Sequence, residues 1–390
     1  MATSRNKILV LGVSSAGGDW PPLAAVVLGL SQRGHSVRCF ADGRIAMTLR
    51  DTAVVVDAVR PDVSLRSYVI RWNEKVTATE STAAGYIPIV TPLTEWSADT
   101  LPTICDLISQ FQPEVLLSQL MTMDLASRIK AQTGLRWCFV NPAYYFGPHS
   151  RRPFEDDFGP YERPLFSHCR SLLESTDLVL HATDAVFDPP PTRLPAHHHY
   201  PGPLLWEPPS TIPPFLAEPG PPWVLVTLSL VPQEEEIRLA RAALTALSNQ
   251  PVRVLMTLGA SHSRDELLPL PRNVRVEHYV SHAEVLKRAC LLVSHAGHGV
   301  VLKALYYGVP MVLVPLGRDQ PGVAARAEAL GVAEVIQPEG LSDVRVSSAV
   351  ARVLTAPQYQ MQAQRHAQRL QSQNPVNIAC EAIETLLNVA

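Results

Sequence analysis

A loop rich in glycine and histidine has the residue types of an anion-binding site. The apolar residues 291–293 lead into the run His-Ala-Gly-His-Gly at 295–299, and a helical pattern follows over 300–307. Glycines at the start of a helix expose backbone N–H groups, and the helix dipole favours negative charge there. This spacing predicts a phosphate-binding loop between a strand and a helix.

A second polar loop follows the same helix. Gly-Val-Pro at 308–310 ends the helix, residues 311–314 form a second apolar run, and the chain then reaches Asp319 and Gln320. In a parallel sheet both loops lie at the carboxyl ends of strands, where ligands bind. A carboxylate beside an amide suits hydroxyl groups. The two loops therefore favour a ligand with phosphates at one end and hydroxyls at the other.

An aspartate stands in the first loop of the chain. Residues 7–13 are typical of a buried strand, Gly17 and Gly18 follow, and Asp19 precedes a helical pattern over 23–33. This loop contains neither Gly-x-Gly-x-x-Gly nor a glycine loop ending in Lys-Ser/Thr, and no Gly-x-Ser-x-Gly elbow occurs in the chain. The loop thus gives no indication of NAD or of ATP in a P-loop.

Three adjacent histidines, at 197–199, raise the question of a metal site. Adjacent side chains cannot all point at one ion, and the run lies in a proline-rich loop. We favour a solvated loop over a metal site. We expect neither a metal nor any other cofactor.

The composition is that of a globular protein. The chain has 390 residues, of which 46% are hydrophobic and 18% charged, so two domains with sizeable cores are expected. The net charge is −3 and no Lys/Arg cluster stands out, so nucleic acid is not an expected partner. The six cysteines lack Cys-x-x-Cys spacing, as free thiols of a reducing compartment do. No apolar run is long enough for a membrane span. We expect a cytoplasmic protein without stable membrane insertion, monomeric or weakly dimeric.

Apolar runs and helical patterns alternate on both sides of a proline-rich stretch. This predicts an α/β protein with two Rossmann-like doubly wound domains facing each other across a cleft. The prolines crowded between 201 and 222 exclude a helix or a central strand there. The predicted parts are a first domain at 1–203, a linker at 204–222, a second domain at 223–374, and a last helix at 375–390 that packs back on the first domain. The expected strands are 7–13, 37–40, 114–117, 136–140, 177–181, 223–228, 253–258, 274–277, 291–293 and 311–314; the expected helices are 23–33, 100–110, 124–132, 234–247, 282–289, 300–307, 346–354, 358–371 and one from Pro375.

The stretch from His295 to Gln320 resembles the donor-binding signature of nucleotide-sugar glycosyltransferases with the GT-B fold. The macrolide, glycopeptide and sterol glycosyltransferases share its histidine and glycines, its Gly-Val-Pro and its Asp-Gln. The segments 17–22 (Gly-Gly-Asp-Trp-Pro-Pro) and 33–37 (Arg-Gly-His-Ser-Val) are similar to the start of the glycopeptide and sterol branch. The resemblance extends over most of the chain.

The resemblance implies a donor-binding role for each matching residue. His295 and the N–H groups of Gly299 and Val300 would hold the donor diphosphate, with Ser229 opposite. Tyr279 would stack on the nucleobase and the Val280 backbone would read its edge, while Asp319 and Gln320 would hold the sugar. The alternatives are a core position for Tyr279 and a helix-capping role for Asp319. The full donor-binding set is Ser229, Tyr279, Val280, His295, Gly297, His298, Gly299, Val300, Lys303, Asp319 and Gln320.

The first domain would bind the acceptor. Asp19 would take the proton of the acceptor hydroxyl or orient that hydroxyl. Six aromatic residues would line an apolar pocket, with an ordinary core as the alternative: Trp72, Tyr86, Trp96, Tyr144, Tyr145 and Phe146.

Several positions depart from the family pattern, among them residues 321–324 (Pro-Gly-Val-Ala), where the family often has Asn-Ala after Asp-Gln. Val300 replaces a phosphate-facing Thr or Ser, and Lys303 replaces a Glu that accepts from ribose hydroxyls. A lysine cannot accept, so Lys303 would lie along the phosphates or be solvated, and a 2′-deoxyribose donor should be tolerated. Asp19 replaces the catalytic His of the plant and macrolide enzymes, and no acid stands near Ser118 and Gln119 to partner it. The glycopeptide branch shares the aspartate, so Asp19 would act alone.

The resemblance implies an inverting, metal-independent hexosyltransferase of bacterial secondary metabolism. It would move a hexose from a UDP or dTDP sugar to a hydroxyl of a lipophilic natural product, flavonoid, polyketide or sterol. Two alternatives stay open. One is a nucleotide-sugar epimerase on the same fold. The other is a non-catalytic relative that binds a ligand or a partner glycosyltransferase.

Overall fold

The computed structural model describes residues 5–13, 18–79, 89–158, 162–229, 233, 235–258 and 262–388. The chain divides into two compact units. The first comprises Met1–Arg151, Pro160–Trp206 and Asn374–Ala390, and the second comprises Arg152–Gly159 and Glu207–Gln373. Most of the expected linker thus belongs to the second unit, and so does a short segment that we had expected in the first. Among the described helices, none combines the length and apolar content needed to cross a bilayer.

The first unit contains a parallel sheet whose strand order reverses at β1. Its strands are β1 (Lys7–Gly12), β2 (Ser36–Ala41), β3 (Val55–Ala58), β4 (Val115–Ser118), β5 (Arg136–Asn141), β6 (Leu178–His181) and β7 (His198–His199). They lie in the order β3-β2-β1-β4-β5-β6-β7, and every pairing is parallel. The loops after β1 and β4 therefore open at a switch point, the usual place of ligands in such sheets.

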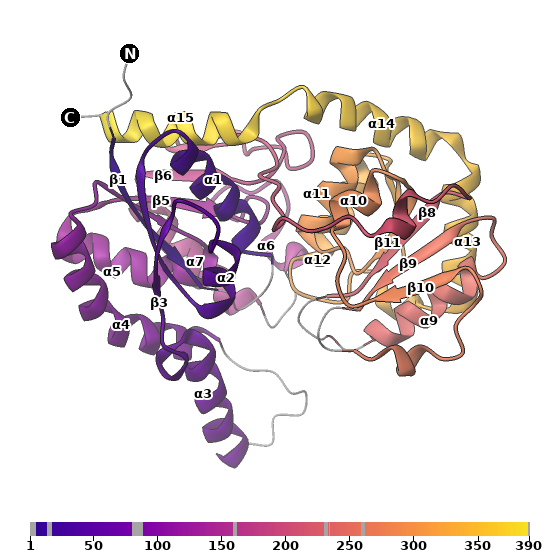
Figure 1. Ribbon diagram of the computed structural model, residues 1–390, viewed down its shortest axis with the longest axis horizontal. Coiled ribbons are helices and arrows are strands. Elements are labelled where there is room, and N and C mark those ends of the chain that lie inside the picture. The colour runs from indigo at the N-terminus through magenta and orange to yellow at the C-terminus, as the bar shows by residue number, and fades with distance from the viewer. Residues whose placement is uncertain are drawn as a thin grey trace. The chain divides into compact units, whose positions relative to one another are not determined.

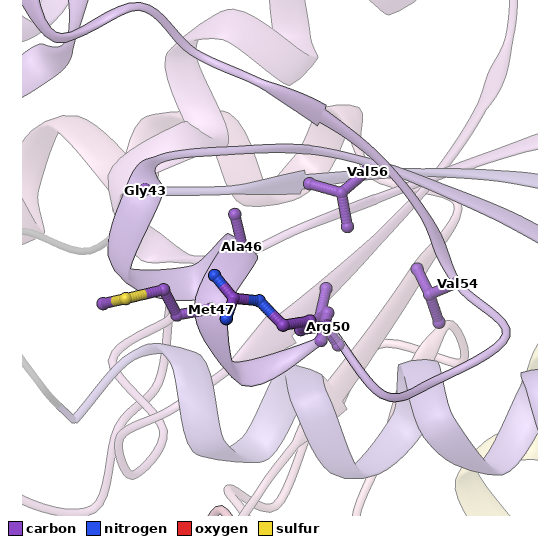
Figure 2. A pocket seen from close by; sticks show the side chains of 7 residues that line it. Gly43, Ala46, Met47, Arg50, Val54 and Val56 are labelled. Carbon is purple, nitrogen blue, oxygen red and sulfur yellow. The ribbon is translucent and has the colours of Figure 1, made fainter.

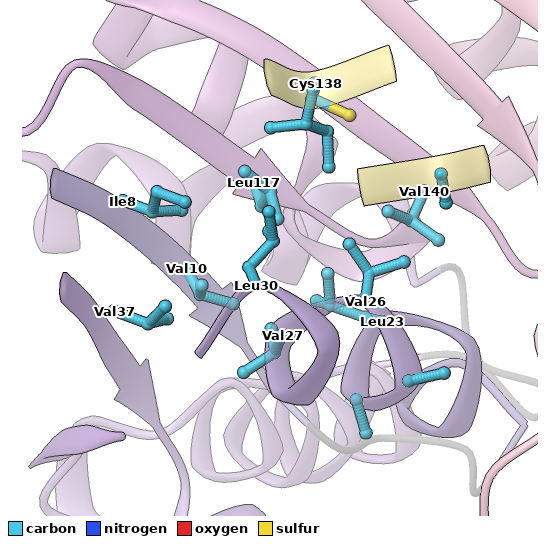
Figure 3. Packing of buried hydrophobic residues seen from close by; sticks show 14 of the residues in the cluster. Ile8, Val10, Leu23, Val26, Val27, Leu30, Val37, Leu117, Cys138 and Val140 are labelled. Atoms are coloured by element: carbon cyan, nitrogen blue, oxygen red, sulfur yellow. The ribbon is translucent and has the colours of Figure 1, made fainter. Parts of the chain in front are cut away.

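Helices cover this sheet (Figure 1). They are α1 (Trp20–Gln32), α2 (Gly43–Thr48), α3 (Leu65–Thr79), α4 (Val90–Phe111), α5 (Met123–Thr133), α7 (Arg163–Leu172) and α15 (Pro375–Asn388), with short 3₁₀ helices at Pro61–Val63, Leu120–Thr122 and Leu173–Ser175. Figure 3 shows α1 packed on the sheet, with Leu23, Val26 and Leu30 directed at Val10 and Val140. This buried apolar face holds the start of α1, and with it Asp19, at the end of β1.

The C-terminal helix α15 packs on α1 because a glycine lets it approach. A Cβ on Gly29 would come within 2.7 Å of Val376 and 2.9 Å of the Cys380 sulfur. Ala379, Cys380 and Ile383 join the core of the first unit. Glu384 then accepts from Arg33 at 2.5 Å and pairs with His35 at 3.0 Å. The Arg-Gly-His motif near the N-terminus thus anchors the end of the chain.

The second unit contains its own parallel sheet. Its strands are β8 (Trp223–Thr227), β9 (Arg253–Thr257), β10 (Val274–Glu277), β11 (Ala289–Ser294), β12 (Met311–Leu313) and β13 (Ala333–Val335), in the order β10-β9-β8-β11-β12-β13. Its helices are α6 (Phe154–Asp157), α8 (Pro214–Ala217), α9 (Glu236–Leu247), α10 (His282–Leu286), α11 (His298–Tyr307), α12 (Gln320–Ala329), α13 (Asp343–Thr355) and α14 (Pro357–Gln371), with 3₁₀ helices at Arg264–Leu267 and Pro338–Gly340. Here the strand order reverses at β8, beside β11.

A buried ion pair joins residues 152–159 to the second unit. Asp157 and Arg326 are 1% and 7% exposed, and two guanidinium nitrogens of Arg326 each donate to a different Asp157 oxygen at 3.1 Å. Arg152 also donates to Asp157 at 2.7 Å. The pair places α6 against α12. Nothing in the local sequence pattern of 152–159 indicates this partner.

The sequence patterns missed several elements of the first unit. The segment after β2 forms α2, β3 and α3, which we had not expected. Helix α4 begins at Val90 rather than near Thr100, because Leu93 and Trp96 continue the apolar face of Ile104 and Leu107 across Pro102.

The histidine run is not a solvated loop. His198 and His199 form the edge strand β7, and His198 is 5% exposed. Asn141 Nδ2 lies 2.9 Å from His181 Nδ1, and His181 Nε2 lies 3.0 Å from His198 Nδ1. Both histidine rings can be neutral in this chain of hydrogen bonds, because His181 accepts at Nδ1 and donates from Nε2, and His198 accepts at Nδ1. Burial, reinforced by neighbouring histidines, lowers the pKa of His181 well below its usual value and that of His198 to about 4.

We expect acid to destabilise the first unit through these two rings. Because their folded pKa values lie below the unfolded value, the unfolded chain binds more protons, and stability is lost as the pH falls from about 6.5 toward 4. A shift to about 4 corresponds to about 3 kcal/mol for His198. The melting temperature measured between about pH 7.5 and pH 5 should depend less on pH in a His181→Gln/His198→Gln variant. Exposed His149→Asn is the control. An unchanged pH dependence in the double variant would contradict this account.

Candidate functional site

The first turn of α11 has no capping side chain. Ser294 ends β11, Ala296 adopts a left-handed φ of 65°, and Gly297 is the N-cap residue without a side-chain hydrogen bond to the helix. Gly299 is exposed, and an added Cβ there would meet no atom within 4 Å. The start of α11 therefore has no N-cap side chain and has open space beside Gly299, at the positive end of the helix dipole, which suits an anion.

His295 is packed behind this turn. It is 8% exposed, the Thr227 carbonyl hydrogen-bonds to its ring, and Nδ1 is buried without a hydrogen-bond partner. Burial, together with the smaller effect of the Arg318 charge, lowers the pKa of His295 to about 4. The ring fits because residue 297 is a glycine: a Cβ there would lie 2.7 Å from His295 Nε2.

A buried carboxylate organises the loop after β8. Glu236 is fully buried and accepts from the Ser229 N–H at 2.8 Å and the Gln233 N–H at 3.3 Å, and His262 Nε2 lies 3.2 Å from it. Arg318 Nη1 donates to Ser229 Oγ at 3.4 Å. Ser229 therefore lies near a cation, as a diphosphate site needs. Sequence analysis missed both Glu236 and Arg318, although Arg318 precedes the predicted Asp319.

The Asp-Gln motif divides into two different roles. Asp319 is partly exposed and is the N-cap residue of α12, yet its side chain makes no capping hydrogen bond. The capping alternative is therefore wrong. Gln320 is 2% exposed and its amide is used internally: Oε1 accepts from the N–H groups of Leu316 and Gly317 at 2.8 and 3.1 Å, and Nε2 donates to Gln233 at 3.1 Å. In this structure Gln320 braces the loop and is not placed to contact a sugar.

The segment after β10 presents one exposed aromatic side chain. Tyr279 is 57% exposed, so it is not a core residue, and Val280 is buried.

Lys303, on α11, is mostly shielded from solvent, so the alternative of a solvated lysine is wrong. Its Nζ lies 2.5 Å from Glu207 Oε1, and both side chains are 14% exposed.

Five of the predicted donor residues thus gather at one edge of the second sheet. Ser229 follows β8, His295 and Gly299 follow β11, Asp319 follows β12, and Tyr279 follows β10. Because these strands are parallel, their carboxyl ends meet at the same edge. The first three lie at or beside the point where the strand order reverses.

In the first unit, Asp19 is placed by the start of α1. It is 8% exposed and is the N-cap residue of α1, again without a side-chain capping bond. Gln119, where a partner acid was sought, is buried and donates to the carbonyl of Val13, which ties the loop after β4 to the end of β1. A carboxylate at position 119 could not donate to this carbonyl, so the amide suits the contact and no acid stands here to partner Asp19.

A second carboxylate of the first unit, Asp124, is already paired. Asp124, in the first turn of α5, pairs with His168 Nε2 at 3.0 Å and accepts from Arg128 at 2.7 Å. Burial, followed by the charges of Asp19 and Asp124, raises the pKa of the Cys169 thiol. Burial alone would raise the pKa of Asp124, but His168 and Arg128 bring it below its usual value.

The predicted aromatic acceptor pocket is largely wrong. Trp96, Tyr144, Tyr145 and Phe146 are each at most 2% exposed and belong to the core. Tyr145, for instance, donates to the Pro148 carbonyl and packs on two histidine rings. Only Trp72 of the described members is partly exposed, and Tyr86 lies outside the described residues.

A surface hollow of about 450 Å³ in the first unit includes none of the predicted residues (Figure 2). It is lined by Gly43, Ala46, Met47, Leu49, Arg50, Val54 and Val56, from α2 and the segment leading into β3. Within the described part of the chain, no three His, Cys, Asp or Glu side chains are grouped to hold a metal ion.

We expect Gly297→Ala to displace the His295 ring, because the new methyl group would overlap Nε2. The substitution should shift the His295 ring resonances in an NMR spectrum and lower the stability by about 1 kcal/mol. Gly299→Ala is the matched control, since its methyl group meets no neighbour. Unchanged His295 resonances in Gly297→Ala would show that the ring is not packed against this glycine.

Comparison with known proteins agrees with the architecture. Residues 241–385 match the family model of the erythromycin biosynthesis protein CIII-like C-terminal domain. The chain is 24% identical to 4′-demethylrebeccamycin synthase of Lentzea aerocolonigenes, over 97% of this chain and 99% of that protein. It is also 24% identical to demethyllactenocin mycarosyltransferase of Streptomyces fradiae, over 96% of this chain and 85% of that protein.

Solved structures show the same fold. The calicheamicin glycosyltransferase CalG4 superposes with a TM-score of 0.74 at 20% identity, over 99% of this chain and 100% of that one. The glycosyltransferase VinC in complex with dTDP superposes with a TM-score of 0.68 at 18% identity, over 97% and 98%. The predicted fold, with two parallel-stranded Rossmann-like sheets, is confirmed, and the predicted resemblance to glycosyltransferases agrees with what these proteins are named. Residues 241–385 are thus similar to the EryCIII-like C-terminal domain, and the chain has the GT-B fold that the solved glycosyltransferases show.

Proposed function

We propose that this protein is an inverting glycosyltransferase that moves a hexose from a nucleoside-diphosphate sugar to a hydroxyl of a lipophilic natural product. The observation that carries the proposal is the uncapped first turn of α11 with the buried His295 behind it. Demethyllactenocin mycarosyltransferase, by its name, transfers a sugar, and VinC was solved with dTDP. These names support a nucleotide-sugar donor for this chain, and the VinC complex favours dTDP as the carrier.

The donor binds at the edge of the second sheet. Its diphosphate accepts hydrogen bonds from the N–H groups of Gly299 and Val300 and from the Ser229 hydroxyl. It also pairs with the Arg318 guanidinium. The exposed Tyr279 ring stacks on the base. Asp319, whose carboxylate makes no capping bond, accepts from the sugar hydroxyls. These donors stabilise the leaving diphosphate without requiring a metal.

Asp19 acts on the acceptor. As the acceptor oxygen attacks the anomeric carbon, its proton passes to the Asp19 carboxylate. The new carbon–oxygen bond forms as the bond to the diphosphate oxygen breaks, and the diphosphate leaves with that electron pair. Attack opposite the leaving group inverts the anomeric centre.

The second candidate is a binding protein without turnover. It is favoured by the inward position of Gln320, which removes one expected sugar contact. Incubation with a nucleotide sugar and a panel of hydroxylated aglycones separates the candidates: a glycosylated aglycone supports transfer, and nucleotide-linked thermal stabilisation without any product supports binding alone. An isomerised sugar formed without acceptor would instead identify an epimerase.

We expect donor binding to take up a proton at His295. One ring N–H of His295 donates to the Thr227 carbonyl, and Nδ1 is the other nitrogen. Nδ1 can therefore donate to a phosphate only if the ring carries a proton on both nitrogens. The pKa must then rise on binding from about 4, and affinity is lost as the pH rises through the bound-state pKa. Calorimetry with a nucleotide sugar, in buffers of different ionisation enthalpy near pH 6, measures this uptake. A nucleotide sugar is chosen because its phosphates do not titrate there.

The His295→Gln variant should bind more weakly and take up no proton at this step. Equal proton uptake by the variant and the wild type would assign the proton to another group. No uptake by the wild type would mean that His295 does not donate from Nδ1.

We expect Asp19→Asn to lower transfer about 10²–10⁴-fold, the usual contribution of a positioned base, while donor affinity changes little. The rate of product formation and the nucleotide Kd give the two readouts. Asp124→Asn is the matched control, because that carboxylate is already paired with His168 and Arg128. Near wild-type turnover in Asp19→Asn would exclude Asp19 as the base and point to Asp124 or to a base supplied by the substrate.

A further inference from the structure

Three neighbouring strands of the second sheet end on a residue with a hydroxyl group. β9, β8 and β11 close with Val-Leu-Met-Thr, Val-Leu-Val-Thr and Leu-Leu-Val-Ser, and their last residues are Thr257, Thr227 and Ser294. Thr227 pairs in register with both of the others, so the three side chains point to the same face of the sheet. Each is at most 3% exposed. Buried hydroxyls need hydrogen-bond partners.

The hydroxyls of Thr257 and Thr227 form a hydrogen-bond chain that begins at His282, the first residue of α10. His282 Nε2 lies 3.0 Å from Thr257 Oγ1, and Thr257 Oγ1 lies 2.9 Å from Thr227 Oγ1. Thr227 Oγ1 in turn lies 3.3 Å from the carbonyl oxygen of Leu228. A carbonyl oxygen only accepts, and each hydroxyl has a single hydrogen to donate. The hydrogen bonds therefore run one way, from the His282 Nε2–H to the Leu228 carbonyl.

This direction fixes the tautomer of the His282 ring. Burial, followed by the Lys303 charge, lowers the pKa of His282 to about 4, although Glu207 opposes them. The ring is therefore neutral near pH 7 and carries one N–H. Since Thr257 Oγ1 must accept from this ring, the hydrogen is on Nε2.

The chain ends on the peptide group that joins Leu228 to Ser229. The carbonyl of this group accepts from Thr227, and its N–H donates to Glu236 at 2.8 Å. A peptide group is planar and its carbonyl and N–H point in opposite directions, so two buried partners fix its orientation. That orientation sets where the Ser229 side chain begins.

We infer that His282 and Thr257 are positioning residues of the donor site, which act through the 228–229 peptide group to hold the Ser229 hydroxyl toward the diphosphate. The inference rests on the proposed function, because Ser229 must contact the diphosphate. His282 lies three residues after Tyr279, so the chain also links the segment proposed to bind the base to the loop proposed to bind the phosphates.

The first test removes the middle hydroxyl. Thr257→Val keeps the shape of the side chain and breaks the chain. It should weaken dTDP binding about tenfold, the usual scale for one hydrogen bond, whereas Thr257→Ser should stay within about threefold of the wild type. Calorimetry gives the Kd values. Thr355→Val is the matched control and should not change the Kd, because this exposed hydroxyl bonds back to the Ala351 carbonyl on α13. Equal affinities of Thr257→Val and the wild type would overturn the inference.

A double-mutant cycle tests whether the chain acts through Ser229. In a Ser229→Ala background, Thr257→Val should cause less than about threefold further loss of dTDP affinity, because the hydroxyl that the chain positions is gone. A general loss of stability would weaken binding equally in both backgrounds. Full additivity of the two losses would therefore contradict the inference.

The tautomer of His282 is measured on the wild type itself. The nitrogen-15 resonances of the ring should show the hydrogen on Nε2, and they should shift in Thr257→Val. A hydrogen on Nδ1 would reverse the chain and take the Thr227 hydrogen away from the Leu228 carbonyl, which would also overturn the inference. If Thr257→Val does not fold, His282→Phe, which keeps a ring and removes the Nε2–H, replaces it in the binding comparison and in the cycle.

The two levels of proposal fail differently. If the wild type binds neither dTDP nor UDP, the proposed function is wrong and the inference falls with it. If the wild type binds dTDP and the loss of the Thr257 hydroxyl leaves that affinity unchanged, the proposed function stands and only the inference is wrong.

Discussion

The uncapped first turn of α11 is the constraint around which the second unit is arranged. The N–H groups at a helix start need partners, and the N-cap residue here, Gly297, has no side chain to supply one. The same glycine leaves room for the His295 ring, which buries an unpartnered nitrogen beside that turn. Both features cost stability in the absence of a ligand; an anion would accept from the N–H groups of the turn, and from Nδ1 once the ring is protonated.

Buried side chains hold the surrounding loops in place. Glu236 satisfies the N–H groups of Ser229 and Gln233, and Gln320 satisfies those of Leu316 and Gly317. An unpaired buried N–H costs about 1–3 kcal/mol, so these contacts stabilise the positions of those four residues. The proposed ligand groups, Ser229 and Asp319, are thereby positioned before a donor arrives. Glu207 and Lys303 do the same for the segment that carries Tyr279.

The first unit uses the end of the chain as part of its core. Glu384 pairs with Arg33 and His35, and Gly29 allows α15 to approach α1 closely. Because Asp19 stands at the start of α1, contacts at the far end of that helix help to fix the proposed base. The buried histidines His181 and His198 belong to the same unit and make its stability sensitive to acid.

The sequence by itself determined the alternating α/β order, the loops that carry Asp19, His295 and Asp319, and the last helix, because apolar runs, glycines and prolines act locally. It did not determine the partners of those loops. Glu207 with Lys303, Asp157 with Arg326 and Asp124 with His168 lie between 44 and 169 residues apart, and no periodic pattern links them. Whether an aromatic residue lines a pocket or fills the core, as Tyr144 and Phe146 do, also depends on packing from other elements. The tertiary structure decided these points, since burial and ion pairing are set by residues that only folding brings together.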